Sequence, residues 1–293
     1  MLEIFLQTLL DFASRGIVGI ILILCILVFA VVNGLIRKTF MQLWQIVVFA
    51  VLFVLSYFVF ADMLSTWIYE KAMLQFGLNT TVVVENVEVY QINNFGDLIS
   101  FIGALANEAK YTEEFAYNLG YSITFSMSLA ILTLLDIIVA PLVTLITWPL
   151  IKLAIPKKWD HANKRWIAPL LSLVEALFGI SVMINCLAAY SEGMSWLVTN
   201  PVILSRLNID TAIFTVLRFF TTDFFGFFKV LNIHLFNFQF AANGEVYSTA
   251  KEFIALTSKV FPNVENGSVE AEALIASYKQ RLLELWMSKN GVS

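Results

Sequence analysis

Long uncharged runs alternate with short charged stretches along this chain, and the runs predict membrane-spanning helices. Residues 16 to 36 carry no charge, and a helix of this length, at about 1.5 Å per residue, matches a hydrocarbon core of about 30 Å. After the charged pair that closes this run, a second uncharged run extends from Thr39 to Ala61. The two predict a helical hairpin. We expect its helices to pack against each other through four small residues: Ala30, Gly34, Ala50 and Ser56.

Two further spans are predicted in the middle of the chain. Residues 115 to 151 are apolar apart from Asp136, but one helix of this length would measure about 55 Å, so part of it must lie outside the lipid. We place the third span at residues 121 to 148. The fourth runs from 166 to 190 and carries a single acid, Glu175.

The segment between the second and third spans, residues 62 to 114, is hydrophilic. It holds eight acidic residues against two lysines. Its β-branched stretch from Thr80 to Ile92 is compatible with a strand, whereas Asn94 to Lys110 places apolar residues on one face of a helix. The helical pattern is the stronger of the two.

A phenylalanine-dense stretch follows the fourth span. Between residues 211 and 232, polar side chains including Arg218 recur at helical spacing on an otherwise aromatic helix. Such a helix either lies in the headgroup region or crosses the membrane with its polar stripe facing other helices, and we prefer the interfacial interpretation. From Gly244 onward, the pattern predicts two short amphipathic helices around a break near Pro262 and Gly267.

These patterns divide the chain into five regions. They are an N-terminal region with the first hairpin (1–61), an acidic insert (62–114), a second helix pair (115–192), an aromatic amphipathic region (193–242) and a helical tail (243–293).

The composition agrees with a membrane protein. Hydrophobic residues make up 59% of the 293 and charged residues 14%, whereas a soluble domain is about half apolar and about a quarter charged. We therefore predict an all-α, polytopic membrane protein with four transmembrane helices, or five if the aromatic helix crosses, together with amphipathic peripheral helices. The net charge of -4 offers no broad basic surface for nucleic acid.

Basic residues concentrate in the two short connections between spans, and they predict the orientation of the protein. The set comprises Arg37, Lys38, Lys152, Lys157, Lys158, Lys164 and Arg165. Lysine and arginine near the ends of spans are retained on the cytoplasmic side. Both connections should therefore face the cytoplasm, and the N-terminus and the acidic insert should lie outside.

Two acids inside the predicted spans are the main candidates for chemistry. An ionised carboxylate at mid-membrane costs about 2.5 to 3.5 kcal/mol on insertion scales, so Asp136 and Glu175 each need a neighbour. Because they lie at different depths in the membrane, they could form two steps of a path for protons or cations. The alternative, which we favour, is that each is protonated or hydrogen-bonded to a polar residue of a neighbouring helix simply to fix packing. Arg218 could supply a countercharge if its helix inserts beside the others.

Patterns of soluble enzymes are not found. The two histidines are far apart and allow neither a zinc triad nor a paired-histidine motif. There is no phosphate-binding glycine loop and no nucleophile elbow. We accordingly predict no catalytic residue, no metal and no cofactor.

Three stretches resemble the colicin V production (CvpA) family of bacterial inner-membrane proteins. They are Gly34-Leu-Ile-Arg37-Lys38 before an apolar helix, the basic connection from Lys152 to Arg165, and Arg165 to Cys186 with Pro169, Ser172 and Gly179. The resemblance covers residues 10 to 190 and departs from the family in the fourth helix, where only Gly179 matches the expected glycines. It implies a multi-pass protein of the bacterial inner membrane, linked to toxin production or export.

From these observations we expect a membrane scaffold or accessory subunit that binds rather than catalyses. Besides the lipid bilayer, its partner would be another protein or a second copy of the chain. The alternatives are a channel or transporter subunit that uses Asp136 and Glu175, and an intramembrane enzyme.

Overall fold

The computed structural model describes residues 17–154, 166–199, 238–265 and 267–291. Within these residues the chain is mostly helical, and two small antiparallel sheets accompany the helices. The predicted aromatic helix with Arg218, and the basic residues Lys157, Lys158, Lys164 and Arg165, lie outside the described residues.

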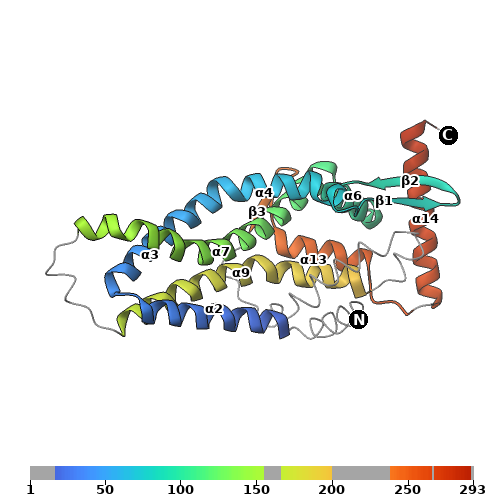
Figure 1. Cartoon of the computed structure of the whole chain (residues 1–293). Helices are drawn as coiled ribbons and strands as arrows, with labels where there is room; N and C mark the ends of the chain where they lie inside the picture. Colours follow the sequence, from blue (N-terminus) through green and yellow to red (C-terminus); the bar gives the residue numbers. More distant parts are fainter. Residues whose placement is uncertain (1–16, 155–165, 200–237, 266, 292–293) are drawn as a thin grey trace.

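Four long helices form a bundle, and each is long and apolar enough to cross a membrane. They are α2 (Ile17–Ile36), α3 (Thr39–Leu55) with its helical continuation to Gln75, α7 (Glu113–Ala154) and α9 (Ile167–Thr199). The four apolar helices predicted from the sequence are thus confirmed. In Figure 1 they run side by side, and the turn at residues 37–38, the C-terminal end of α7 and the N-terminal end of α9 lie at the same end.

The second predicted span continues well beyond its expected end at Ala61. After α3 the chain stays helical to Gln75, through the segments η1 (Ser56–Phe60), α4 (Ala61–Trp67), η2 (Ile68–Ala72) and α5 (Met73–Gln75). Two of these segments, η1 and η2, are π-helical turns. Such turns insert an extra residue into a helix and are frequent near functional sites.

Helix α7 serves two parts of the molecule. Its 42 residues correspond to a length of about 63 Å, which exceeds the hydrocarbon thickness about twofold. Phe115, Leu119 and Ile123 near its start belong to one hydrophobic core, and Leu129 and Ile137 belong to another inside the bundle. The N-terminal part of the helix therefore packs in a core that is separate from the core of the bundle.

The expected pairing of the first two helices is wrong over most of their length. Helix α2 packs chiefly on α9, while α3 packs on α7 and α9. A side chain at Gly34 would come within 2.5 Å of the Cα atom of Pro169 in α9, so this glycine allows α9, rather than α3, to approach. Of the other small residues, Ala50 is exposed on the surface of the bundle.

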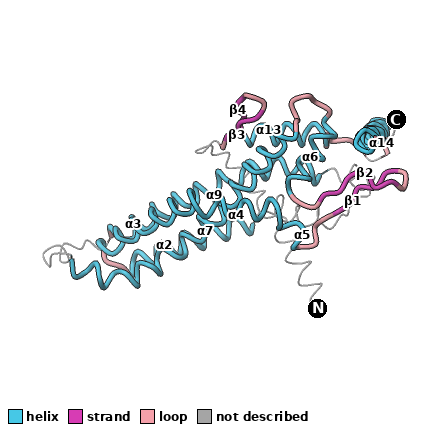
Figure 2. The backbone as a smooth tube through the Cα atoms, turned by 90° about the horizontal axis from the view of Figure 1, so that it is seen from above, coloured by secondary structure: helices cyan, strands magenta, loops and turns pink. Residues whose placement is uncertain are grey.

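At the other end of the bundle, the insert and the C-terminal tail form a single unit. This head unit comprises β1 (Thr80–Val84), β2 (Val87–Ile92), α6 (Phe95–Ala106), β3 (Gln239–Ala242), β4 (Glu245–Ser248), α13 (Thr249–Val260), α14 (Val269–Asn290) and the first turns of α7. Its core includes fully buried Phe101, Phe115, Phe253 and Phe261. Because these phenylalanines come from distant parts of the chain, neither the insert nor the tail has a separate core. Figure 2 shows the head unit gathered at one end of the long helices.

Two hairpins make the all-α prediction too narrow. The strands β1 and β2 form on the stretch that was compatible with a strand, and their turn places Glu85 and Asn86 at positive φ. The strands β3 and β4 were not predicted. They are joined by Asn243 and Gly244, both at positive φ, which is the pair that favours a tight hairpin turn between two strands.

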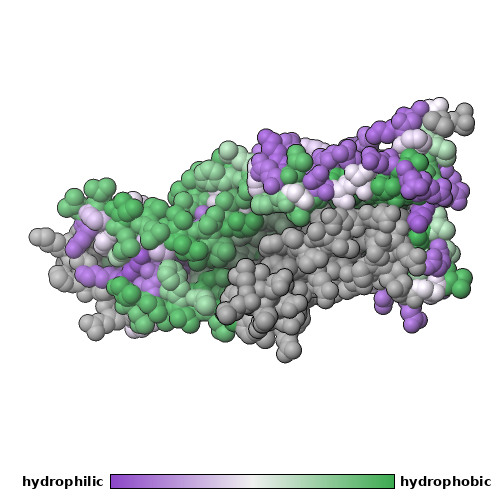
Figure 3. Space-filling model, turned by 45° about the vertical axis from the view of Figure 1, so that its right-hand side comes forward, coloured by the Kyte–Doolittle hydropathy of each residue, from purple (hydrophilic) through white to green (hydrophobic). Residues whose placement is uncertain are grey.

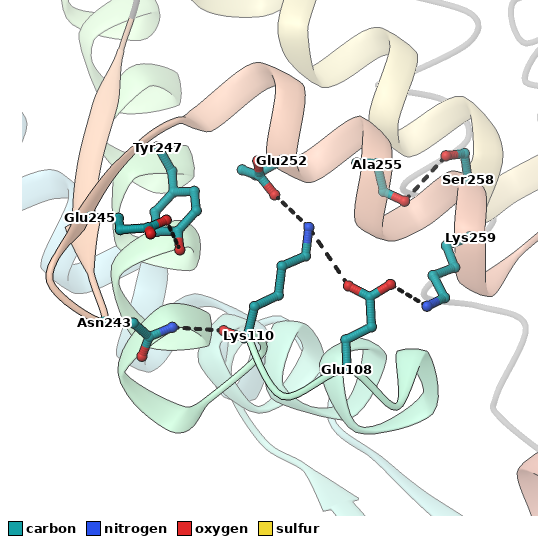
Figure 4. A network of polar contacts seen from close by, with 9 residues as sticks. All are labelled: Glu108, Lys110, Asn243, Glu245, Tyr247, Glu252, Ala255, Ser258 and Lys259. Atoms are coloured by element: carbon teal, nitrogen blue, oxygen red, sulfur yellow. Dashed lines mark hydrogen bonds and ion pairs between the residues drawn. The ribbon is translucent and has the colours of Figure 1, made fainter.

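Polar contacts attach the tail to the insert (Figure 4). Lys110 forms an ion pair with Glu252 at 3.2 Å, and Lys259 pairs with Glu108. The Asn243 side chain donates to the Lys110 carbonyl at 2.8 Å. The tail therefore lies on the same side of the bundle as the insert. Figure 3 shows mostly hydrophobic residues over the visible face of the bundle, and most of the hydrophilic residues over the end that carries the head unit.

Candidate functional site

A buried cluster of polar side chains joins all four helices near one end of the bundle. This is the end that carries the basic turn at residues 37–38, and we call it the basic end. The members of the cluster are Asn33 on α2, Arg37 in the turn, Gln42 and Gln45 on α3, the carbonyl of Pro141 on α7, and Glu175 on α9. Counted from the helix starts, Gln45 and Glu175 lie about 9 Å and about 12 Å along their helices. The cluster is thus closer to one end of the bundle than to its middle.

Gln45 is the central member of this cluster. Its side-chain oxygen accepts hydrogen bonds from Arg37 and from Asn33, the latter at 2.9 Å. Its nitrogen donates to both carboxylate oxygens of Glu175 at 2.9 Å. One neutral amide therefore connects a cation to an anion, with each of its ends matched to the charge that it faces.

Arg37 and Glu175 each form a further hydrogen bond besides those with Gln45. Arg37 also donates to the backbone carbonyl of Pro141 at 2.9 Å, and Gln42 donates to Glu175 at 3.0 Å. Arg37 is 8% exposed and Glu175 6% exposed. A buried ion needs such partners because its desolvation costs several kcal/mol. The cluster can therefore hold both charges away from water.

Arg37 is buried in the bundle, although the sequence indicates only a role in orienting the protein. The sequence presents it as one of the basic residues that orient the protein, together with Lys38 and Lys152, and those two lysines are exposed. Arg37 instead turns into the bundle, toward α7 and α9. It remains at the predicted end of the helices, but its main contacts are inside the protein.

Asp136, the other predicted acid, lies deeper in the bundle. It is 6% exposed, and the side chain of Ser56 on the neighbouring helix lies near its carboxyl group. Ser56 opens the π-helical turn η1. Both residues are about 26 Å from the basic ends of their helices, some 15 Å deeper than Glu175. The structure therefore does not bring Asp136 and Glu175 together.

One carboxylate oxygen of Asp136, Oδ2, has no hydrogen-bond partner within the described part of the chain. The same is true of Oε1 of Gln42. A buried acceptor without a donor costs about 1 to 3 kcal/mol, so a proton on the carboxyl of Asp136, or a small bound ion or water, would relieve this cost. Asp136 is thus the buried acid whose hydrogen bonding is incomplete.

Sequence reasoning missed Gln42 and Gln45, although a signal was present. Both stand in an uncharged, apolar helix, three residues apart and so on one face. Amides inside a span indicate a contact with another polar group. What the sequence could not show is that this contact would be Glu175, 130 residues away from Gln45.

Metal binding finds no support in the described residues, where no group of three His, Cys, Asp or Glu side chains could hold an ion. No family model, curated protein or solved structure matches this chain. The buried cluster, Asp136 and the head unit are therefore the features of the molecule that bear on its function.

Proposed function

We propose that this protein is a membrane scaffold or accessory subunit whose head unit binds another protein outside the cytoplasm. Because residues 10 to 190 resemble the colicin V production family, the proposal also places the protein in the bacterial inner membrane. For the same reason it assigns the protein to an envelope process of the colicin V production type. The observation that carries the proposal is the head unit itself. The insert, which precedes α7 in the sequence, and the tail, which follows α9, form its core together.

The connection between head unit and bundle supports a scaffold. Helix α7 passes from the head core into the bundle core without interruption. Helix α9 packs on α13 of the tail, where a side chain at Gly193 would meet the ring of Phe253. Because the same helices form both parts, the head unit is held in a fixed position above the membrane.

The charge cluster supports the same function. Arg37 and Glu175 have their hydrogen-bonding groups directed at Gln42, Gln45 and Pro141. A cluster in which protein groups bond to both charges links helices and fixes their register, as polar residues between membrane helices commonly do. In this proposal its role is to hold the bundle, and no catalytic residue is assigned.

Photo-crosslinking in native membranes tests the proposal. A photoreactive amino acid replaces Val246 in the head unit, which is 68% exposed, or Leu150 in the bundle, which is 70% exposed. The proposal predicts one defined protein adduct from position 246 and only lipid adducts from position 150. Lipid or diffuse adducts from both positions, with a protein that purifies alone in mild detergent, would contradict it.

A second function, transfer of protons or small cations, is favoured by one observation, the unpaired oxygen of Asp136. Proteoliposomes that contain the parent, Asp136→Asn or Glu175→Gln would test it. This function requires flux in the parent that falls on substitution of Asp136. Background flux in all three proteins would remove it.

A further inference from the structure

The head unit contains an open groove of about 1380 Å³. The helix α6 lines it on one side, the strand β2 and the start of α7 border it, and the C-terminal half of α14 faces it. It is larger than the pockets of about 300 to 1,000 Å³ that hold small ligands. The size therefore favours a segment of a macromolecule.

The hollow follows from the sequence of α6. Gly96, Ser100, Gly103 and Ala104 line the groove, and their spacing of four, three and one residues places them on one face of the helix. The opposite face carries Leu98, Phe101 and Leu105, which are buried in the head core. Gly96 and Gly103 are buried and let Tyr69 and Tyr111 pack against the helix, whereas the small side chains of Ser100 and Ala104 are partly exposed and leave space that larger ones would fill.

The charge of the groove is negative. Five carboxylates line it, against Arg281 and Lys289. Two of the five have roles inside the protein, because Asp97 caps α6 and Glu108 pairs with Lys259. The three others, Glu88, Glu113 and Glu114, are exposed and form no ion pair with any residue that the structure describes.

Aromatic rings accompany these carboxylates. Tyr111, Tyr117 and Trp286 line the groove, and Tyr117 is 53% exposed. Ring faces attract ammonium and guanidinium groups. Tyr111 makes such a contact with a residue beside the groove, since the Lys110 ammonium lies 4.8 Å from the centre of its ring.

We propose that this groove binds an extended, lysine- or arginine-rich segment of a partner protein. The inference rests on the proposed scaffold function and names the site and the chemistry of its partner. Basic side chains would meet Glu88, Glu113 and Glu114, while the ring of Tyr117 would contact their stems. The backbone of the segment would lie over Ser100 and Ala104 of α6.

A binding experiment with the purified full chain in detergent tests this site. The probe is a short labelled peptide of alternating lysine and serine, with a glutamate-serine peptide of equal length as the negative control. Combined substitution Glu88→Gln, Glu113→Gln and Glu114→Gln should weaken binding of the lysine peptide by about tenfold, since it removes three exposed ion pairs. The matched variant carries Glu85→Gln, Glu265→Gln and Glu270→Gln, which lie outside the groove, and should bind like the parent.

A second variant separates the groove from general electrostatic attraction. Ser100→Phe keeps every charge but fills the floor of the groove, so it should also weaken the binding of the lysine peptide. Equal binding by the parent, Ser100→Phe and both triple variants would overturn the inference, as would no binding by the parent. Far-ultraviolet circular dichroism of each variant checks that the head unit remains folded.

The two proposals can fail separately. If a protein adduct forms from position 246 in both the parent and the groove triple variant, the scaffold function stands and the groove is not its binding site. If the lysine peptide requires the groove but no protein adduct forms in native membranes, the site stands and the scaffold function falls.

Discussion

Arg37 and Glu175 are oppositely charged, buried, and joined through the side chain of Gln45, which accepts from one and donates to the other. Arg37 follows α2, Gln45 lies on α3, and Glu175 lies on α9. The arrangement connects the two helices of the first hairpin to a helix more than a hundred residues later. The register of the bundle at its basic end depends on this connection.

Single and double replacement of the two charges should show their coupling. Arg37→Gln or Glu175→Gln leaves the other charge buried without its counterpart, and each should lower the free energy of unfolding by about 3 kcal/mol. The combined variant, which buries no charge, should lose less than the sum of the two. Thermal unfolding in detergent, followed by tryptophan fluorescence, measures these values. Strictly additive losses would mean that the charges do not interact.

Gln45→Leu should destabilise the protein while leaving both charges in place. It removes the hydrogen bonds between the amide and Glu175, and a bond to a charged group contributes about 1.5 to 3 kcal/mol. Leu43→Ala on the same helix is a suitable control, because Leu43 is exposed and its loss should have little effect. An unchanged unfolding temperature for Gln45→Leu would show that Gln45 is not the link.

Two glycines should respond differently to the same change. A methyl group at Gly34 would meet the backbone of Pro169 and Ala168, at 2.5 Å and 2.9 Å. At Gly179 it would meet the tip of the Ile137 side chain at 2.6 Å, and this side chain can rotate. We expect Gly34→Ala to cost about 1 to 3 kcal/mol and Gly179→Ala clearly less. The same unfolding assay decides the order, and a reversed order would contradict the packing of α2 on α9.

The attachment of the tail should weaken in acid. The hydrogen bond from Lys259 outweighs desolvation and lowers the pKa of Glu108 below its ordinary value of 4.5. Because the folded-state pKa is the lower one, this pair stabilises the head unit above pH 4.5, and its contribution is lost as the pH falls through the lowered pKa. The effect should be below about 1 kcal/mol, as for exposed ion pairs in general.

Hydrogen exchange of α13 on either side of that pH measures this effect. The parent should exchange faster in the acid sample than general acid effects explain. Glu108→Gln, which has no carboxylate at this position, provides the reference. Equal acid sensitivity of the two proteins would mean that Glu108 does not hold the tail.

The spans could be predicted because their signal is local. An uncharged run such as residues 16 to 36 indicates a membrane helix without knowledge of its neighbours. The tail helices α13 and α14 could also be predicted, because their apolar faces and the break between them are visible in the local sequence. The β3–β4 hairpin also has a local signal, the Asn243-Gly244 pair. It was not predicted, because the helical pattern of the tail is the stronger one.

The rest depends on contacts between distant residues. Nothing near Lys110 indicates its partner Glu252, which lies 142 residues later. Helix α2 is expected beside α3 because a short turn joins them, but the close approach at Gly34 places α2 against α9. Similarly, the groove of the head unit needs both α6 and α14, and each helix alone shows only an ordinary amphipathic pattern.

Labelling of single cysteines in intact cells tests most directly the claim that the insert and the tail form one head unit on one side of the membrane. In a background of Cys25→Ser and Cys186→Ser, one variant carries Glu85→Cys in the insert, one Glu270→Cys in the tail, and one Lys38→Cys in the turn. All three positions are exposed. We expect a membrane-impermeant maleimide to label positions 85 and 270 from outside, and position 38 only after the cells are opened. Labelling of positions 85 and 270 from opposite sides would contradict the structure of the head unit.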